Sequence, residues 1–331
     1  MGKTIYTQGA SPAVPYLSGT TIDSSSSSLN NYSGIIQTFV AVGSSSAIAA
    51  SSTDGVNWIA RTLPSSATWS ALAYGNNTFV AIAQSSATAA SSTNGITWTL
   101  RTLPASLVWK RAAYGNNTFV AIAYSSTTAA SSTDGITWTA RTIPSSGSLA
   151  AVTFGNNTFL IIANASTTAA TSTDGITWTT RTMPVSSSWS AVTYGNNIFV
   201  AVTSNASTTA ATSTDGITWT TRTLPAASYW RALAYGNNTF VVKSSTGSTT
   251  AATSTDGITW TIRTSTTNVS YMTYGKSTFT AVSYGSSGTP STVAATTTDG
   301  ITWVQRTLPA AKWNAVVFGE PTVSIRPLNT I

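Results

Sequence analysis

The stretch Ser132-Thr-Asp-Gly-Ile-Thr-Trp138 decides the fold, because versions of it recur along almost the whole chain. A period of about forty residues is typical of propellers and solenoids, in which each repeat forms one supersecondary unit. The spacings between successive copies are 40, 40, 40, 41, 41 and 43 residues. The tryptophans that end the seven copies are Trp58, Trp98, Trp138, Trp178, Trp219, Trp260 and Trp303.

A second recurring block lies between these copies and is clearest at 69–82. Together the two blocks predict four strands per repeat. In one repeat these strands cover 69–74, 78–83, 88–92 and 96–102. The segments Gly75-Asn-Asn77 and Thr93-Asn-Gly95 supply residues that tolerate positive φ and therefore predict hairpin turns.

Alternation along the first strand indicates how the repeats stack. It places Trp69, Ala71 and Ala73 on one side, and Leu72 with Tyr74 on the other. A sheet with one small face and one bulky face stacks well on copies of itself. Radial stacking achieves this while hiding the sheet edges.

The two ends of the chain each carry part of a repeat. The first recognisable unit begins with a second strand at 38–42, and the chain ends on a first strand at 313–319. The sequence therefore predicts an all-β, seven-bladed β-propeller of four-stranded blades, with one blade closed by strands from both termini. An open solenoid would instead need polar capping repeats at its ends.

The domain prediction has three parts: an extended arm at 1–33, the propeller at 34–319 and a tail at 320–331. The arm contains the serine run 24–28 and little apolar periodicity. We expect it to be flexible alone and to serve for attachment.

Composition limits the possible functions. The 331 residues include 41% hydrophobic and 10% aromatic residues, enough for a core, and only 7% charged residues. There is no cysteine and no histidine, which removes disulfides, the usual general base and the commonest metal ligand. No apolar run has the length of a membrane span, and the N-terminus lacks the apolar region of a secretory signal. We expect no membrane insertion.

The net charge of +7 does not predict nucleic-acid binding. Seven of the ten arginines occupy one repeated position and are therefore spread around the ring, whereas nucleic-acid binders concentrate basic residues in a stripe or tail. We expect these arginines to pair with the repeated aspartates or to extend across strand ends. They are Arg61, Arg101, Arg141, Arg181, Arg222, Arg263 and Arg306.

The repeated Ser-Thr-Asp-Gly-Ile-Thr-Trp block resembles the Asp-box of the sialidase-like (BNR) propellers, which forms the turn between the third and fourth strands of a blade. Here the block is one residue shorter between Asp and Gly. The near-identical, Ser/Thr-rich units are also similar to propellers among bacteriophage virion proteins. The resemblance implies a structural role for the residues at the acid position. They are Asp54, Asn94, Asp134, Asp174, Asp215, Asp256 and Asp299.

Catalysis is not expected. Outside the repeated position the only acids are Asp23 and Glu320, whereas glycoside hydrolysis generally needs two carboxylates flanking the bond. A residue present in every repeat cannot define a single site. We therefore predict no catalytic residue, no bound metal and no cofactor.

Departures from the repeat indicate where a ligand could bind. Three loops, 204–209, 244–250 and 284–292, are longer than their counterparts and all join a second strand to a third. Insertions on one face of a repeat protein commonly mark its binding face. Lys110 and Arg111 are further non-repeated charges on this face. The predicted ligand-binding residues are Trp230, Arg231, Lys243, Tyr271, Tyr284, Lys312 and Trp313.

Two interpretations remain for the five tryptophans that begin first strands: they either stack on sugar rings or pack between blades. The leading hypothesis for the whole protein is a non-enzymatic, virion-associated propeller, located in a bacteriophage tail, fibre or capsid. It would bind other virion proteins through residues 1–33 and present a recognition face to a cell-surface glycan. The alternatives are a free lectin-like carbohydrate-binding module and, third, an Asp-box glycosidase.

Overall fold

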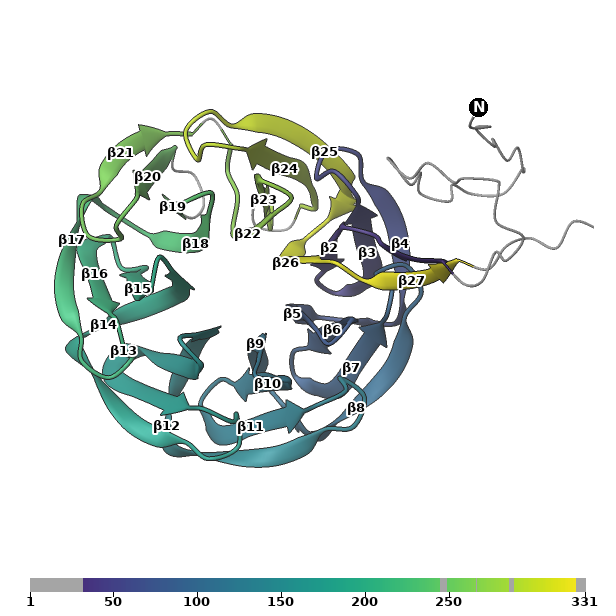
Figure 1. Ribbon diagram of the computed structural model, residues 1–331, viewed down its shortest axis with the longest axis horizontal. Helices are drawn as coiled ribbons and strands as arrows, with labels where there is room; N and C mark the ends of the chain where they lie inside the picture. The colour runs from purple at the N-terminus through teal and green to yellow at the C-terminus, as the bar shows by residue number, and fades with distance from the viewer. Residues whose placement is uncertain (1–31, 245–248, 266, 286–288, 326–331) are drawn as a thin grey trace, which may run out of the picture.

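The computed structural model describes residues 32–244, 249–265, 267–285 and 289–325. Within these ranges all elements of regular secondary structure are β-strands. None of the described residues form a helix that is long and apolar enough to cross a membrane. The sheets stand radially around a central axis, which we call the channel axis, and form a ring, a β-propeller (Figure 1). The predicted arm lies outside the described residues except for its last two positions, as does the end of the tail from 326 onward.

We name the repeats A to G around the ring and the strands of each repeat a to d from the channel outward. Four repeats form separate four-stranded sheets. Repeat A consists of β26 (Trp313–Gly319), β2 (Thr38–Gly43), β3 (Ser46–Ser52) and β4 (Ile59–Ala67). Repeat B consists of β5 (Trp69–Gly75), β6 (Thr78–Ala83), β7 (Ser86–Ser92) and β8 (Thr99–Leu107). Repeat F consists of β18 (Trp230–Gly236), β19 (Thr239–Ser244), β20 (Thr250–Ser254) and β21 (Thr261–Thr264). Repeat G consists of β22 (Tyr271–Gly275), β23 (Thr278–Val282), β24 (Ser291–Thr297) and β25 (Val304–Ala311).

Repeats C, D and E are joined in one nine-stranded sheet. Three of its strands have 17, 15 and 17 residues and each covers two strand positions, so the nine strands fill the positions of three repeats. The strands are β9 (Trp109–Gly115), β10 (Thr118–Ala123), β11 (Ser126–Ser132), β12 (Thr139–Gly155), β13 (Thr158–Ser172), β14 (Thr179–Gly195), β15 (Ile198–Thr203), β16 (Ser207–Ser213) and β17 (Thr220–Ser228).

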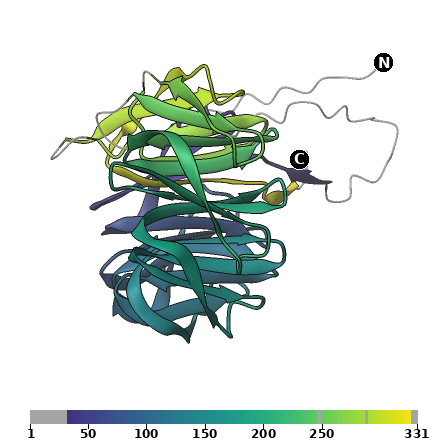
Figure 2. The ribbon, with the colours of Figure 1, turned by 90° about the vertical axis from the view of Figure 1, so that its left-hand side faces the viewer.

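The closure predicted from the chain ends is confirmed. Strand β26 pairs antiparallel with β2, with Phe39 opposite Phe318 and Thr38 opposite Gly319. The same hairpin continues past the ring as a two-stranded ribbon of β1 (Tyr32–Ile35) and β27 (Thr322–Ile325). Figure 2 shows the described termini leaving the disc together. Strand β1 includes residues 33 and 34, between which the sequence predicts the boundary of arm and propeller.

Strand alternation defines two faces of the disc. The turns between strands a and b and between c and d lie on one face, which we call the turn face. The turns between b and c and the connections from d to the next a lie on the other, the mouth face. The ribbon continues from the a–b side of repeat A and therefore leaves from the turn face. A hydrogen bond supports this placement: the Thr322 amide donates to Asn77 Oδ1, which belongs to the a–b turn of repeat B.

The predicted fourth strand starts too early. The sequence places it at 96–102, but β8 runs from Thr99 to Leu107. Residues 93–97 instead form a wide turn around Asn94, whose Oδ1 accepts hydrogen bonds from the amides of Ile96 (2.8 Å) and Thr97 (2.9 Å). These two amides therefore bond to a side chain and not to a sheet ladder.

The predicted orientation of the first-strand tryptophan is also wrong. Trp69 shares a cluster with Leu72, not with Ala71 and Ala73. The cause is a β-bulge between Trp69 and Ala71, where the pairing with β6 shifts register. One extra residue turns the tryptophan to the opposite face of the sheet.

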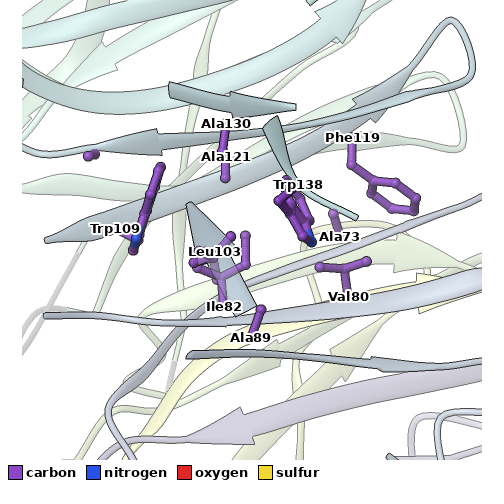
Figure 3. Close-up of a cluster of buried hydrophobic side chains, with 12 residues drawn as sticks. Ala73, Val80, Ile82, Ala89, Leu103, Trp109, Phe119, Ala121, Ala130 and Trp138 are labelled. Atoms are coloured by element: carbon purple, nitrogen blue, oxygen red, sulfur yellow. The ribbon is translucent and has the colours of Figure 1, made fainter. Parts of the chain in front are cut away.

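The core lies between neighbouring blades. Figure 3 shows one such cluster, in which Val80, Ile82 and Leu103 of repeat B pack against Trp109 and Phe119 of repeat C. Each buried large side chain of this kind contributes roughly 2–3 kcal/mol by area. Interfaces between blades, and not single blades, therefore carry the hydrophobic stabilisation.

Glycine at the end of strand a serves a different purpose from the predicted one. Positive φ in the a–b turn of repeat B falls on Asn76 (43°) and Asn77 (57°), as a two-residue hairpin turn requires. Gly75 instead leaves space, because a Cβ there would lie 2.0 Å from the ring of Tyr114 in the next blade. Corresponding close approaches pair Gly115 with Phe154, Gly155 with Tyr194, Gly195 with Tyr235, Gly236 with Tyr274 and Gly275 with Phe318.

Candidate binding site at the channel mouth

The repeated aspartates act within their own turns. In repeat D, Asp174 Oδ1 accepts hydrogen bonds from the amides of Ile176 (2.8 Å) and Thr177 (2.9 Å) and from the Ser172 hydroxyl (2.8 Å). Burial alone would raise the pKa of this carboxyl, but these donors and the Asp174 backbone amide outweigh it and hold the pKa below 3.8. The described residues contain no group of three or more acids that could hold a metal ion.

The repeated arginines do not use the aspartates as their hydrogen-bond partners. Each arginine Nε donates to the hydroxyl of the residue ten positions earlier, on strand c of the same blade, at 2.8–3.0 Å. The expected pairing with the turn acids is therefore wrong. The hydroxyl is nearer because strand c pairs directly with strand d, where the arginine stands.

The first-strand tryptophans pack between blades and are not available to stack on a sugar. Trp69, Trp109, Trp189, Trp230 and Trp313 are all 0% exposed. Trp230 and Trp313, two of the predicted ligand-binding residues, are thus part of the core. The bulge at the start of strand a is the reason, since it directs the ring into the blade interface.

Lys243 is also buried, with 0% exposure, although it was predicted to bind a ligand. Its Nζ donates to the Ser265 hydroxyl and to the Thr267 carbonyl (2.7 Å) and hydroxyl (3.1 Å), and it lies 4.4 Å from the ring centroid of Trp303. Burial lowers its pKa from 10.5 to about 7. This lysine therefore connects repeats F and G internally and does not face the channel mouth.

Three of the predicted residues do come together: Arg231, Tyr271 and Tyr284 line one hollow of about 300 Å³. The hollow lies on the mouth face, where residues of repeats on different sides of the ring meet. Lys312 does not line it. The remaining lining residues are Ser44, Thr68, Ser70, Gln84, Lys110, Arg111, Ser270 and Asn314.

Tyr271 is the centre of the charged part of this hollow. The Arg111 guanidinium lies 5.4 Å from its ring centroid and the Arg231 guanidinium 6.0 Å, distances at which cations are attracted to aromatic rings. Burial alone would raise the pKa of the Tyr271 phenol, but Arg111, Arg231 and Lys110 outweigh it and lower the pKa below 10.0. Burial, reinforced by Arg111 and Arg231, lowers the pKa of Lys110.

Lys110 and Arg111 are not among the residues that the sequence predicts to bind a ligand, although the signal is present. Positions two and three of strand a carry serine or alanine in most repeats, such as Ser70-Ala71 and Ser190-Ala191. Lys110-Arg111, Arg231 and Tyr271 are the exceptions at these positions, together with Asn314. Two of the serines at position two connect blades: Ser70 Oγ donates to the Trp109 carbonyl at 2.9 Å and Ser190 Oγ to the Trp230 carbonyl at 2.7 Å.

A larger, shallow hollow of about 420 Å³ lies on the perimeter between repeats C and D. It is lined by residues such as Arg141, Pro144, Ile176 and Trp178, which occupy repeated positions. We favour the smaller hollow as the candidate site because its residues break the repeat and so mark one place on the ring.

No protein-family model matches the chain, and no curated protein matches it in sequence. Solved β-propeller structures are similar in fold. A selenomethionine-substituted virginiamycin B lyase from Staphylococcus aureus is 13% identical, with a TM-score of 0.64, and the match covers 72% of this chain and 85% of that one. A protein from Lactobacillus plantarum is 12% identical (TM-score 0.65; 87% and 100% covered). YCF48 bound to D1 peptide is 16% identical (TM-score 0.57; 72% and 83% covered).

The chain is a β-propeller. Identities this low show the fold alone, and the neighbours include both a lyase and a protein described with a bound peptide.

Proposed function

We propose that this protein is a non-enzymatic recognition propeller that binds its target through the hollow at the channel mouth. The observation that carries the proposal is the convergence of Lys110, Arg111, Arg231 and Tyr271, which occupy positions where most other repeats carry serine or alanine. The repeated aspartates and arginines are engaged in turns and strand contacts, which supports a structural role for them.

A binding role is favoured over catalysis because of the chemistry of the hollow. Its lining residues include cations, hydroxyls and amides but no Asp or Glu. Glycoside hydrolysis generally needs two carboxylates that flank the scissile bond, and the described acids in the aspartate turns lie on the opposite face. The Asp-box glycosidase is accordingly the weakest of the three hypotheses.

We also propose that the ring has seven blades and that the aspartate turns are related to the Asp-box. We further propose that the protein associates with a bacteriophage virion through residues 1–33. The similarity of the Ser/Thr-rich repeats to virion propellers motivates the last point. The position of the β1–β27 ribbon supports it, because attachment from the turn face would leave the mouth face free for a cell-surface glycan. A free lectin-like module would have the same binding hollow on its mouth face but would not associate with a particle.

Particle association separates these two possibilities. A chain lacking residues 1–31 keeps β1 and the ring, so we expect an unchanged melting curve by circular dichroism together with loss of incorporation into particles. Copurification of the shortened chain with particles at the full-length level would remove the attachment role and leave the free module as the better hypothesis.

Recognition at the hollow is tested with charge reversal. We expect Arg231→Glu to abolish attachment of the labelled protein to host cells, because it places an acid beside Arg111 and Tyr271. Lys312→Glu is the matched control, since it makes the same change in net charge outside the hollow. Equal attachment by both variants and the parent would contradict recognition at this site.

A further inference from the structure

We propose that the hollow at the channel mouth binds a phosphoryl group, held jointly by Lys110, Arg111 and Arg231. This inference deepens the proposed recognition role by naming the chemistry of the ligand. It concerns a single place on the ring, since these residues are departures from the repeat.

The first step is the charge balance of the hollow. Lys110 and Arg111 come from β9 in repeat C, and Arg231 comes from β18 in repeat F. Both arginines approach one ring, Tyr271, at 5.4 Å and 6.0 Å from its centroid. No carboxylate is among the lining residues. Three like charges that meet in a partly enclosed space repel one another, and an anion would offset that repulsion.

The second step is that these cations have no ion-pair partner among the residues of the hollow. Where Ser70 and Asn314 stand at the equivalent position, each donates a hydrogen bond to a tryptophan carbonyl of the next blade. Lys110 instead lies 5.6 Å from the ring centroid of Tyr124, and Arg111 Nη1 donates to the Lys110 carbonyl. Lys110 and Arg231 thus stand where other repeats have a residue that connects blades, and no carboxylate of the hollow pairs with them.

The third step selects the anion. A carboxylate has one charge and two oxygens, whereas a phosphate monoester carries about −1.5 to −2 and three acceptor oxygens. Two guanidinium groups and an ammonium group arranged around one space match the phosphate monoester better than the carboxylate, because each cation can bond a different phosphate oxygen. The Ser270 hydroxyl in the same lining accepts a hydrogen bond from the Tyr284 amide and can donate its own proton to the ligand. The volume of about 300 Å³ is sufficient for a phosphorylated monosaccharide.

Isothermal titration calorimetry tests the proposal on the full-length protein at about pH 8, where a phosphate monoester is mainly doubly charged. The probes are inorganic phosphate, sulfate, acetate and glucose 6-phosphate, with glucose as the uncharged comparison. We expect phosphate and glucose 6-phosphate to bind and acetate and glucose to show no binding. Tighter binding of glucose 6-phosphate than of inorganic phosphate would indicate a phosphorylated saccharide as the source, and the reverse order would indicate the free ion.

Substitutions locate the site. Arg111→Gln and Arg231→Gln should each weaken phosphate binding about tenfold or more, since each removes a charge-assisted hydrogen bond. Lys312→Gln, with the same change in charge, should stay within about twofold of the parent. Melting curves identify any variant that is not folded, and Lys110→Gln provides a third test at an independent position.

Three results would overturn the inference: no heat of binding with phosphate, equal weakening in Lys312→Gln, or acetate binding as tightly as phosphate. These outcomes are distinguishable from failure of the proposed function. If phosphate does not bind while Arg231→Glu still abolishes attachment to cells, the ligand class is wrong and the recognition site stands. If phosphate binds but Arg231→Glu leaves cell attachment unchanged, the hollow is a phosphate-binding site that does not mediate recognition of the cell.

Discussion

A single side chain at the acid position shapes each turn between strands c and d. Asn94 makes the same turn contacts as the aspartates, since its Oδ1 accepts hydrogen bonds from the amides of Ile96 (2.8 Å) and Thr97 (2.9 Å). The bonds therefore depend on the acceptor oxygen and not on the negative charge.

This comparison gives a prediction for repeat D. Asp174→Ala should lower the free energy of unfolding by about 1 kcal/mol, because two backbone amides lose their acceptor. Asp174→Asn is the matched control and should cost little, as Asn94 indicates. Urea denaturation measures both. A calcium-dependent rise in melting temperature that Asp174→Ala removes would contradict the structural role.

The turn acids also predict an acid-dependent loss of stability. Backbone and side-chain donors outweigh burial and lower the pKa of Asp256 from 3.8 to about 2. A lowered pKa in the folded state stabilises the protein above the unfolded value of 3.8, and this contribution is lost as pH falls toward about 2. Melting temperature should fall over this range, and less so in Asp256→Asn. An equal fall in both proteins would show that Asp256 does not contribute.

Lys243 has the opposite pH dependence. Its folded pKa of about 7 lies below the ordinary 10.5, so the unfolded chain binds the proton more tightly between these values. The stability of the parent should therefore rise with pH from about 7 to 10.5. Lys243→Met should flatten this rise and increase stability near neutral pH by about 1–3 kcal/mol, because a buried charge is removed. Urea denaturation at several pH values measures both effects, and an unchanged slope would rule out titration of Lys243.

At the scale of the strand, the sequence predicts the inner part of a blade better than its outer part. The second strand was predicted at 78–83 and is observed at Thr78–Ala83, because apolar alternation and a two-residue turn define it. The fourth strand starts three residues late, since a side-chain acceptor competes with the sheet for the same amides. Alternation alone also could not reveal the bulge after Trp69, which depends on packing against the next blade.

The candidate site was predictable only in part for the same reason. Arg231, Tyr271 and Tyr284 could be recognised as departures from the repeat on one face. Trp230, Trp313 and Lys243 are departures or aromatic positions too, yet each is buried by contacts with residues of a neighbouring repeat. Sequence position gives the face of a strand, but not which side chains a blade interface covers.

Contact between neighbouring first strands gives an element-scale prediction. Gly155→Ala should destabilise the protein by about 1–3 kcal/mol, because the new Cβ would lie 2.0 Å from the Tyr194 ring and the blades would have to separate locally. Gly147→Ala is the control, since its Cβ would meet Ala163 only at 3.4 Å. Thermal unfolding compares the two, and equal melting temperatures would contradict a tight inter-blade contact at Gly155.

At the scale of the whole molecule, stability depends on closing the ring. Removing 313–331 deletes β26 and β27 and exposes the edge of β2, so we expect loss of cooperative unfolding and aggregation. A chain that ends at Ile325 keeps both strands and should melt like the parent. Circular dichroism melting and light scattering provide the comparison. An unchanged melting curve after removal of 313–331 would mean that the ring is stable without the shared blade.

The cluster of cations at the mouth has a kinetic consequence. The aspartates in the turns have repeated arginines beside them, since Arg61 bonds to Ser51, three residues before Asp54. Lys110, Arg111 and Arg231, in contrast, meet in a hollow that has no carboxylate in its lining. The mouth is therefore a local region of unbalanced positive charge. A negatively charged surface would attract this region before contact, and added salt would slow association by shortening the range of the attraction.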